Sequence, residues 1–157
     1  PVPIVIAMVL VLIVAWVLKY TKFGRYVYAL GSNREALRLS GVNIKRVEIA
    51  VYMISAFVCS IGAIVLIGKL NVAQPVAGDG YEMDAIAAAI IGGTSIYGGE
   101  GNVIGTFIGA ILVGTIRNGL NLLNVSPSVQ PVVIGAAIVL AVFYDKMKSQ
   151  QKTKRSE

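Results

Sequence analysis

Residues 1–18 read PVPIVIAMVLVLIVAWVL and contain neither a charged residue nor a glycine. An α-helix rises about 1.5 Å per residue, so this stretch covers about 27 Å, close to the thickness of a membrane's hydrocarbon core. Trp16 and Tyr20 lie at its end, where aromatic rings favour the level of the lipid headgroups. The stretch therefore predicts a membrane-spanning helix.

The composition of the whole chain indicates the same environment. Of its 157 residues, 56% are apolar and 14% are charged, whereas soluble domains average about 45–50% apolar and 25% charged residues. The chain has no His and one Cys, which excludes a structural zinc site and leaves little for disulfides or His-based catalysis. We expect an integral membrane protein and not an enzyme, with no catalytic residue, metal, cofactor or nucleic-acid partner.

The chain begins with Pro, and the apolar run starts at once. A signal peptide has a basic start and a small-residue cleavage site, and residues 1–18 have neither. We expect the chain to be the carboxyl-terminal part of a longer protein.

Four further stretches are candidates for crossing the membrane. Residues 47–68, 102–123 and 129–144 are long enough, or nearly so, to span it. Residues 83–97, MDAIAAAIIGGTSIY, are shorter and interrupted by glycine. Taken alone, they fit a re-entrant segment or a core helix.

The distribution of charge decides how many of these stretches cross. Residues 19–46 are rich in Lys and Arg, the tail 145–157 is also basic, and residues 69–84 hold one Lys and three acids. Cytoplasmic loops are enriched in Lys and Arg, so the basic segments are expected inside and the acidic one outside. An odd number of crossings must then separate the acidic loop from the tail. Residues 102–123 and 129–144 supply two of them, so residues 83–97 must supply the third. The sequence predicts an all-α, polytopic transmembrane helix bundle of five spans: 1–18, 47–68, 83–97, 102–123 and 129–144.

The cytoplasmic loop 19–46 contains its own helix signals. Ser32 and Glu35 fit a capping box, in which the Ser hydroxyl accepts an N–H three residues on and the Glu reaches back. Gly41 is a natural left-handed stop, and Asn43 is suited to cap the helix that runs into the next span. The loop is thus predicted to hold a short helix.

The surface of this short helix has two interpretations. Leu37 and Gly41 share a strip beside the one that holds Arg34 and Arg38, and an exposed apolar and basic surface of this kind invites a partner. In the other interpretation, the basic residues near the membrane only set the orientation of the chain and bind anionic headgroups, and Glu35 is only a helix cap.

A glycine-rich stretch follows residue 91. It has neither the Lys of a P-loop nor the glycine spacing of a dinucleotide site, because Ile104 stands where the third glycine is required. Residues 98–101 predict a tight cytoplasmic turn. Glycines that recur at four-residue spacing let helices approach closely. We expect helix packing at Gly92, Gly93, Gly101, Gly105 and Gly109.

Polar residues end the span 102–123, near the predicted outer surface. Arg117 either snorkels to the headgroups or lines a solute path. Asn118 and Asn121 share a helical face and are candidates to hydrogen-bond a hydroxylated solute along that path. The acids of residues 79–84 fit an ordinary outer loop or a docking face for another protein.

Several strings in this order resemble a known family: GRYVYALGSNREALRLSGVNIKR (24–46), AQPVAGDGYEMDAIAAA (73–89), the glycines of 92–101, and NGLNLLNV (118–125). They resemble the carboxyl-terminal half of bacterial ABC importer permeases for monosaccharides, and most of all ribose permeases. The resemblance implies a multi-pass subunit of the bacterial plasma (inner) membrane with about ten helices, embedded in membrane lipid. It also implies three partners: a cytoplasmic ATP-binding subunit, an extracytoplasmic sugar-binding protein and a second permease copy in a homodimer.

The same resemblance assigns a role to the cytoplasmic loop. Residues 32–41 are similar to the coupling loop of these permeases, and their pattern resembles E-A-A-x-x-x-G with Leu37 in place of the second Ala. The implied ATPase-coupling residues are Ser32, Glu35, Ala36, Leu37 and Gly41. The implied mechanism is alternating access, in which the permease performs no covalent chemistry.

Two alternatives stay open at this point. The first is a related permease for a branched-chain amino acid, a nucleoside or a furanosyl signal molecule. The second is a carrier driven by an ion gradient, which often bears an intramembrane acid or charged pair. The position of Glu48, Asp84 and Arg117 near span ends counts against the second alternative.

Overall fold

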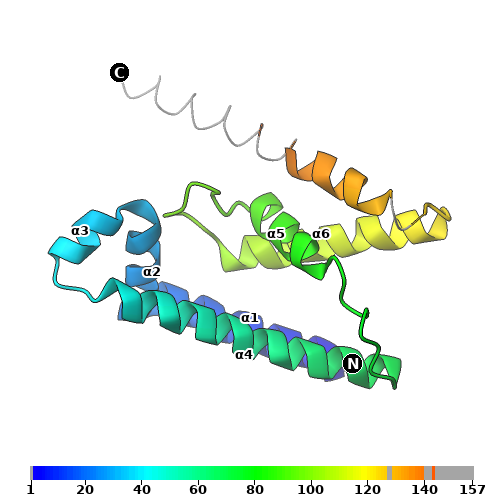
Figure 1. Cartoon of the computed structure of the whole chain (residues 1–157), viewed down its shortest axis with the longest axis horizontal. Helices are drawn as coiled ribbons and strands as arrows, with labels where there is room; N and C mark the ends of the chain where they lie inside the picture. The colour runs from blue at the N-terminus through cyan, green and yellow to red at the C-terminus, as the bar shows by residue number, and fades with distance from the viewer. Residues whose placement is uncertain (1, 127–128, 140–142, 144–157) are drawn as a thin grey trace. The chain divides into compact units, whose positions relative to one another are not determined.

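A computed structural model describes residues 2–126, 129–139 and 143 of the chain, and every regular element in these residues is a helix (Figure 1). The chain divides into two compact units, residues 1–77 with 97–100 and residues 78–96 with 101–157. The all-α prediction is confirmed for the described residues. Three of their helices are long and apolar enough to cross a membrane: α1, α4 and α6.

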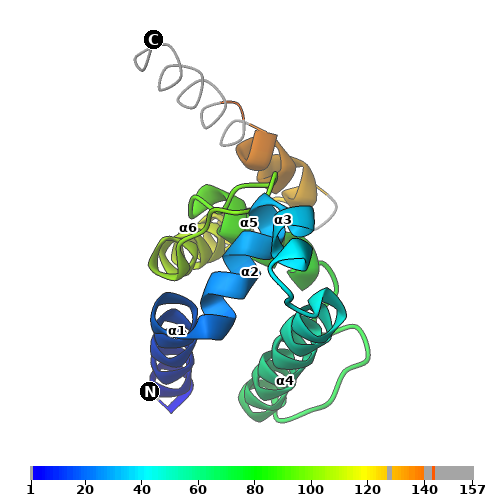
Figure 2. The same ribbon diagram turned by 90° about the vertical axis from the view of Figure 1, so that its left-hand side faces the viewer.

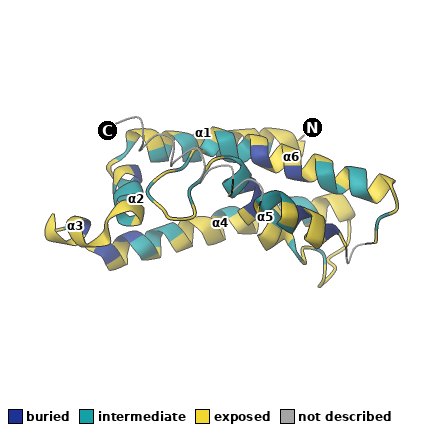
Figure 3. Cartoon of the chain, turned by 90° about the horizontal axis from the view of Figure 1, so that it is seen from above, coloured by how far each residue is buried: buried dark blue, intermediate teal, exposed yellow. Residues whose placement is uncertain are grey.

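The first unit contains two of these long helices. α1 (Val2–Tyr20) and α4 (Ile44–Leu70) have 19 and 27 residues, so they extend about 28 and 40 Å. No residue of α1 is buried within this chain (Figure 3), as expected for an apolar helix that lipid or other helices surround. α1 includes residues 2–18 of the span predicted at 1–18, whose first residue lies outside the described residues, and α4 includes the whole span predicted at 47–68.

Two short helices, α2 (Lys22–Ser32) and α3 (Arg34–Leu39), connect α1 to α4 (Figure 2). The turn from α1 into α2 depends on Thr21, whose Oγ1 accepts from the N–H of Gly24 at 3.2 Å and donates to the carbonyl of Val17 at 2.7 Å. A side chain on Gly24 would overlap the backbone of Leu18. The sharp turn therefore requires glycine at residue 24.

The predicted capping box is wrong by one residue. Ser32 is the last residue of α2, and the extended backbone falls on Asn33 (φ −152°, ψ 96°). Asn33 Oδ1 accepts from the N–H of Ala36 at 2.9 Å, and Glu35 pairs with Arg38 instead of reaching back. The helical run of α2 continues through Ser32, so the next polar residue takes the cap.

The end of the loop follows the sequence expectation. Gly41 has φ +80°, in the left-handed region. Asn43 caps α4, with its Oδ1 accepting from the N–H of Arg46 at 3.2 Å. Both predictions about these residues are confirmed.

The second unit is built on a hairpin of two helices, α5 (Tyr81–Ile91) and α6 (Val103–Leu122), with a further helix at Gln130–Val139. Ala87, Ala88, Val113 and Ile134 form its buried core, one or two from each of these three helices (Figure 3). The helix at 130–139 lies within the predicted span 129–144. The end of that span and the tail 145–157 lie outside the described residues, apart from residue 143.

α5 is shorter than the predicted span 83–97. It has 11 residues, so it extends about 16 Å. Gly93 has φ +88°, and the N–H of Thr94 donates to the carbonyl of Ala89 at 2.9 Å. This left-handed glycine ends the helix six residues before Tyr97.

Candidate functional site

The first candidate site is the exposed surface of the loop around α3. Every residue from 31 to 41 is exposed except Leu37, which is 6% exposed. The prediction that Leu37 lies on an exposed apolar surface is therefore wrong. α3 packs against α4, and Leu37 is buried as Ile44 and Val47 are at the start of α4.

The exposed apolar residue of α3 is Leu39, at 78% exposure. We define the α3 surface as Ser32, Glu35, Ala36, Leu39 and Gly41. Sequence reasoning missed Leu39 because a six-residue helix offers too few positions to show which side a neighbouring helix covers.

The arginines beside the α3 surface are paired. Arg34 Nη1 lies 2.8 Å from Glu48 Oε1 on α4, and Arg38 pairs with Glu35. The side chains of Arg34, Glu35 and Arg38 are about two-thirds exposed, so these ion pairs contribute less than about 1 kcal/mol each. The pairing nevertheless makes the surface less basic than the sequence suggests.

A glycine turn lies against the residues that lead into α3, within the same unit. A Cβ added to Gly31 would lie 2.5 Å from the backbone nitrogen of Gly99, and one added to Gly98 would lie 2.6 Å from the carbonyl oxygen of Gly31. Gly98 and Gly99 have φ +83° and +78°. The contact is made by backbone atoms, and side chains would prevent it.

The packing glycines do not all lie in the same place. Side chains at Gly92, Gly105 and Gly109 would overlap backbone atoms across the contact between α5 and α6. Gly93 has open space around it and ends α5, and Gly101 precedes the start of α6. The structure therefore brings three of the five predicted packing glycines together in one helix contact.

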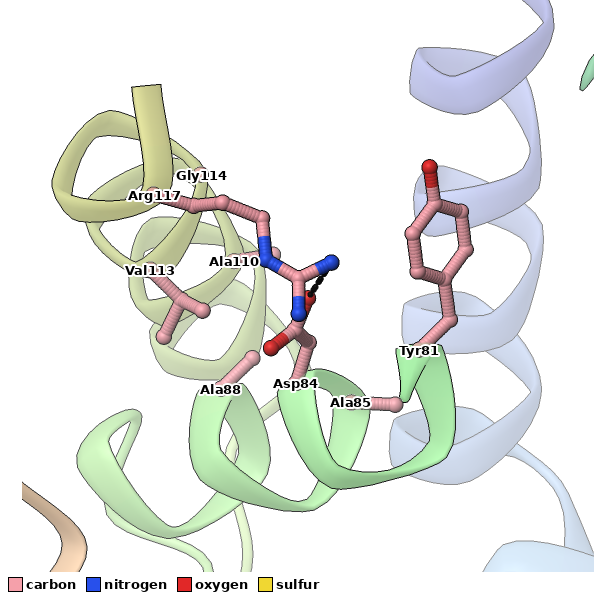
Figure 4. Close-up of a pocket in the computed structure, with 8 residues that line it drawn as sticks. All are labelled: Tyr81, Asp84, Ala85, Ala88, Ala110, Val113, Gly114 and Arg117. Atoms are coloured by element: carbon pink, nitrogen blue, oxygen red, sulfur yellow. Dashed lines mark ion pairs between the residues drawn. The ribbon is translucent and has the colours of Figure 1, made fainter. Parts of the chain in front are cut away.

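The second candidate site is a pocket of about 310 Å³ between α5 and α6. Figure 4 shows Arg117 reaching from α6 toward Asp84 on α5, where its Nη1 lies 2.9 Å from Asp84 Oδ2. The two side chains are 25% and 20% exposed. The guanidinium also lies 5.5 Å from the centre of the Tyr81 ring, a cation–π distance. The walls are small: Ala85, Ala88, Ala110, Val113 and Gly114.

The ion pair leaves polar atoms without partners. In the described part of the chain, Asp84 Oδ1 and Arg117 Nε are buried and make no hydrogen bond. An unpartnered buried polar atom costs about 1–3 kcal/mol, and more when it is charged. Both atoms have almost no accessible surface, so the ion pair carries this cost inside the protein. Its described residues include no group of three His, Cys, Asp or Glu side chains that could hold a metal ion.

Sequence reasoning placed Asp84 in an acidic outer loop and left Arg117 undecided. The missed signal is that α5 has acids in its first turn and α6 has a base five residues before its end, while glycines hold the two helices in contact. In a hairpin, the first turn of one helix lies beside the last turns of the other, so these opposite charges meet.

The predicted path residues lie elsewhere. Asn118 and Asn121 are exposed and do not line the pocket. Asn121 Oδ1 accepts from Nε2 of Gln130 at 2.7 Å, and Nε2 also donates to the carbonyl of Val125 at 3.3 Å. Gln130 is 6% exposed, so Asn121 helps to hold the turn after α6.

The chain is similar to known permease proteins. A family model described as "Branched-chain amino acid transport system / permease component" matches residues 2–142. The ribose import permease protein RbsC of Escherichia coli (strain K12) is 48% identical over 149 residues, which is 94% of this chain and 46% of that protein. RbsC of Bacillus subtilis (strain 168) is 46% identical over 150 residues, 95% of this chain and 46% of that protein.

A permease named for a hexose is also similar. The D-allose transport system permease protein AlsC of E. coli (strain K12) is 39% identical over 150 residues, 96% of this chain and 46% of that protein. No solved structure matches the chain.

The chain spans about half the length of the curated relatives it matches. The similarity confirms the resemblance to bacterial sugar permeases found in residues 24–46, 73–89 and 118–125. Since the family model covers residues 2–142, the chain belongs to the family of branched-chain amino acid transport system permease components.

Proposed function

We propose that this chain forms part of the membrane permease subunit of an ATP-driven bacterial importer, whose cargo is ribose or a similar monosaccharide. Membership of a transport permease family over residues 2–142 is the observation that carries the proposal. Identities of 48% and 39% to permeases named for ribose and allose favour a sugar over the amino acid of the family's description. A branched-chain amino acid or a nucleoside is the alternative cargo.

In this function the permease hydrolyses no ATP. A cytoplasmic ATP-binding subunit supplies the energy, an extracytoplasmic binding protein delivers the sugar, and a second permease copy completes a homodimer in the plasma (inner) membrane. The helices convert movement of the ATP-binding subunits into alternating access of a path between them.

Five crossings with a cytoplasmic carboxyl terminus are part of the proposal. α4 has Lys45 and Arg46 in its first turn and is long enough to cross, which favours an outside location for residues 71–80. The glycine turn 97–100 contacts Gly31, on the side of the basic loop. On this topology α5 covers about 16 Å of the membrane and the non-helical residues 92–96 cover the rest. Such backbone is tolerated at membrane depth when protein surrounds it.

The α3 surface is the proposed docking site for the ATP-binding subunit. It is a short, capped and exposed helix on the basic loop, with Leu39 as an apolar contact. Leu37 is buried where α3 packs against α4, so a movement of α3 is transmitted to the long helix α4. Gly41 supplies the turn between them, and Ser32 lies against the glycine turn 97–100.

One observation favours a carrier driven by an ion gradient as a second candidate. Asp84 and Arg117 form a partly buried charged pair between two apolar helices, and such pairs occur in ion-coupled carriers. Uptake that survives an ionophore but not ATP depletion would exclude this second candidate.

Reconstitution tests the proposal. The full-length permease is placed in proteoliposomes with its ATP-binding subunit and binding protein, and uptake of labelled ribose, allose and leucine is measured with and without ATP. We expect ATP-dependent uptake of a sugar, abolished by Leu39→Asp at the α3 surface. Leu70→Asp, at the other end of α4, is the matched control and should retain uptake. Absence of ATP-dependent sugar uptake by the unmodified complex would contradict the proposal.

Cysteine labelling tests the topology. Cys59→Ala removes the one cysteine of this chain, and Arg38→Cys, Asp79→Cys and Glu100→Cys are added singly at exposed positions. In sealed cells a membrane-impermeant maleimide should label only the cysteine at residue 79. Labelling at residue 38 or 100 from outside would overturn the five-span arrangement.

A further inference from the structure

The glycine turn 97–100 links the two compact units of the chain. Its residues belong to the first unit, with the loop around α3, whereas the segments on either side of it, 78–96 and 101–157, belong to the second. One peptide bond on each side of the turn therefore connects it to the segments that hold α5 and α6. Consecutive Cα atoms stay about 3.8 Å apart, so a displacement of the turn carries residues 96 and 101 with it.

Backbone atoms hold the turn against the end of α2. A Cβ on Gly31 would lie 2.5 Å from the nitrogen of Gly99, and a Cβ on Gly99 would lie 2.9 Å from that of Ser32. Gly98 and Gly99 both have left-handed backbones, with φ +83° and +78°, so the shape of the turn requires glycine. The glycines have no side chains that could bend, and a push from Gly31 or Ser32 therefore displaces the turn directly.

The same end of α2 is joined to α3 through a single residue. Asn33 is both the C-cap of α2 and the N-cap of α3. Its N–H donates to the carbonyl of Ala29 at 2.9 Å, and its Oδ1 accepts from the N–H of Ala36 at 2.9 Å. A displacement of α3 therefore moves Gly31 and Ser32, the two residues that lie against the turn.

Within the second unit, the hairpin of α5 and α6 is held together at both ends. Near the turn, the glycine contact between α5 and α6 is made by backbone atoms, and the hydroxyl oxygens of Thr94 and Thr106 lie 3.4 Å apart. At the other end, Arg117 on α6 pairs with Asp84 on α5 (Figure 4). The hairpin therefore moves as one body when the turn is displaced.

The other covalent route from α3 to the hairpin is slack. It runs along α4 and then through residues 71–80, which lie between the end of α4 and the start of α5 and form no helix. A segment of this length reaches about 33–36 Å when it is fully extended, so it can change its length without moving α5. The turn 97–100 is the tighter of the two connections.

We infer that the glycine turn 97–100 transmits the movement of α3 to the hairpin of α5 and α6, with Gly31, Gly98 and Gly99 as positioning residues. The inference rests on the proposed function, in which the α3 surface docks the ATP-binding subunit. Leu37 transmits the movement of α3 to α4, and the turn transmits it to α5 and α6. Helices of both units then respond to one docked partner.

Gly31→Ala separates the turn from α2, and Gly62→Ala is its matched control. Both glycines lie in helices of the first unit, but a Cβ at Gly62 meets nothing within 4 Å. The full-length permease is reconstituted with its ATP-binding subunit and binding protein, and imported ribose and hydrolysed ATP are measured in the same vesicles.

We expect Gly31→Ala to import at least about five-fold less sugar per ATP, as for a modest coupling between two sites. ATP hydrolysis continues in this variant because the α3 surface is intact, and Gly62→Ala should match the unmodified protein. A role of Gly31 in stability alone would lower import and hydrolysis together. An unchanged ratio of sugar to ATP in Gly31→Ala would therefore overturn the inference.

A disulfide across the contact makes the opposite change. With Cys59→Ala to remove the native thiol, Ser32→Cys and Gly99→Cys are combined. Their Cβ positions lie 2.9 Å apart, and disulfide-bonded Cβ atoms lie about 3.5–4.5 Å apart, so a small shift admits the bond. If α2 and the turn move as one body, the oxidised permease should import as much sugar per ATP as the same variant after reduction.

Import that stops on oxidation and returns on reduction would show that the contact opens in every cycle, and the inference would be wrong. Failure of the two cysteines to bond would contradict the contact itself. If Gly31→Ala yields no assembled complex, the disulfide result decides. If the unmodified complex imports no sugar with ATP, the proposed function fails and the inference fails with it. If it does import sugar, an adverse result in either variant removes only the role of the turn.

Discussion

Gly109→Ala tests whether backbone contact between α5 and α6 holds the second unit together. The added methyl would overlap the carbonyl oxygen of Ala88 and lie 3.1 Å from both its carbonyl carbon and the nitrogen of Gly92. All three are backbone atoms, so no side chain can rotate away and the helices must separate. Over-packing of this kind costs about 1–3 kcal/mol.

The control is Gly119→Ala on the same helix, where a Cβ meets nothing within 4 Å. Both changes raise helix propensity by about 1 kcal/mol, so their difference isolates the overlap. One kcal/mol shifts the melting temperature by about 2–4 °C for 150–250 residues and by less in a longer protein. Thermal unfolding of the purified full-length permease should therefore start a degree or more lower in Gly109→Ala than in Gly119→Ala. If Gly109→Ala melts at or above the temperature of Gly119→Ala, the close helix contact is not what stabilises this unit.

Four further predictions concern the loop and the turn after α6. Asn33→Ala removes the cap of α3 and should cost about 1 kcal/mol, seen as faster amide hydrogen exchange over residues 34–39, whereas Ser32→Ala should leave that exchange unchanged. A double-mutant cycle on Arg34 and Glu48 should give a coupling free energy below about 1 kcal/mol, because Arg34 is 65% exposed; a larger value in thermal unfolding would contradict this. Gly41→Asn should retain more ATP-driven uptake than Gly41→Val, because Asn tolerates the left-handed backbone at φ +80° and a β-branched residue does not. Gln130→Ala should lower stability by about 1 kcal/mol through loss of its bonds to Asn121 and Val125, and Asn121→Ala should lower melting temperature more than it changes the KM for the sugar.

The sequence predicted the long helices well because each depends on a local signal. The uninterrupted apolar runs of α1 and α4 predict helices without any information about neighbouring elements. Asn43 caps α4 through atoms only three residues away. Gly41 likewise stops a helix through its own backbone freedom. These features follow from composition and short-range spacing.

The misplaced features depend on contacts between elements. Ser32 and Asn33 are both good caps, and which one acts is set by where α2 ends. Leu37 is buried because α3 packs on α4, which a helical wheel of six residues does not reveal. Asp84 and Arg117 are 33 positions apart, and they meet only because α5 and α6 form a hairpin.

The contact of Gly31 with Gly98 and Gly99 has a consequence for protein engineering. It joins two segments far apart in the chain through main-chain atoms alone, so no side-chain exchange can re-create it once its geometry is altered. Chimeras between related permeases that take residues 24–46 from one parent and 97–100 from the other would combine backbones shaped separately. Hybrids that inherit both segments from one parent should assemble in higher yield than those that split them.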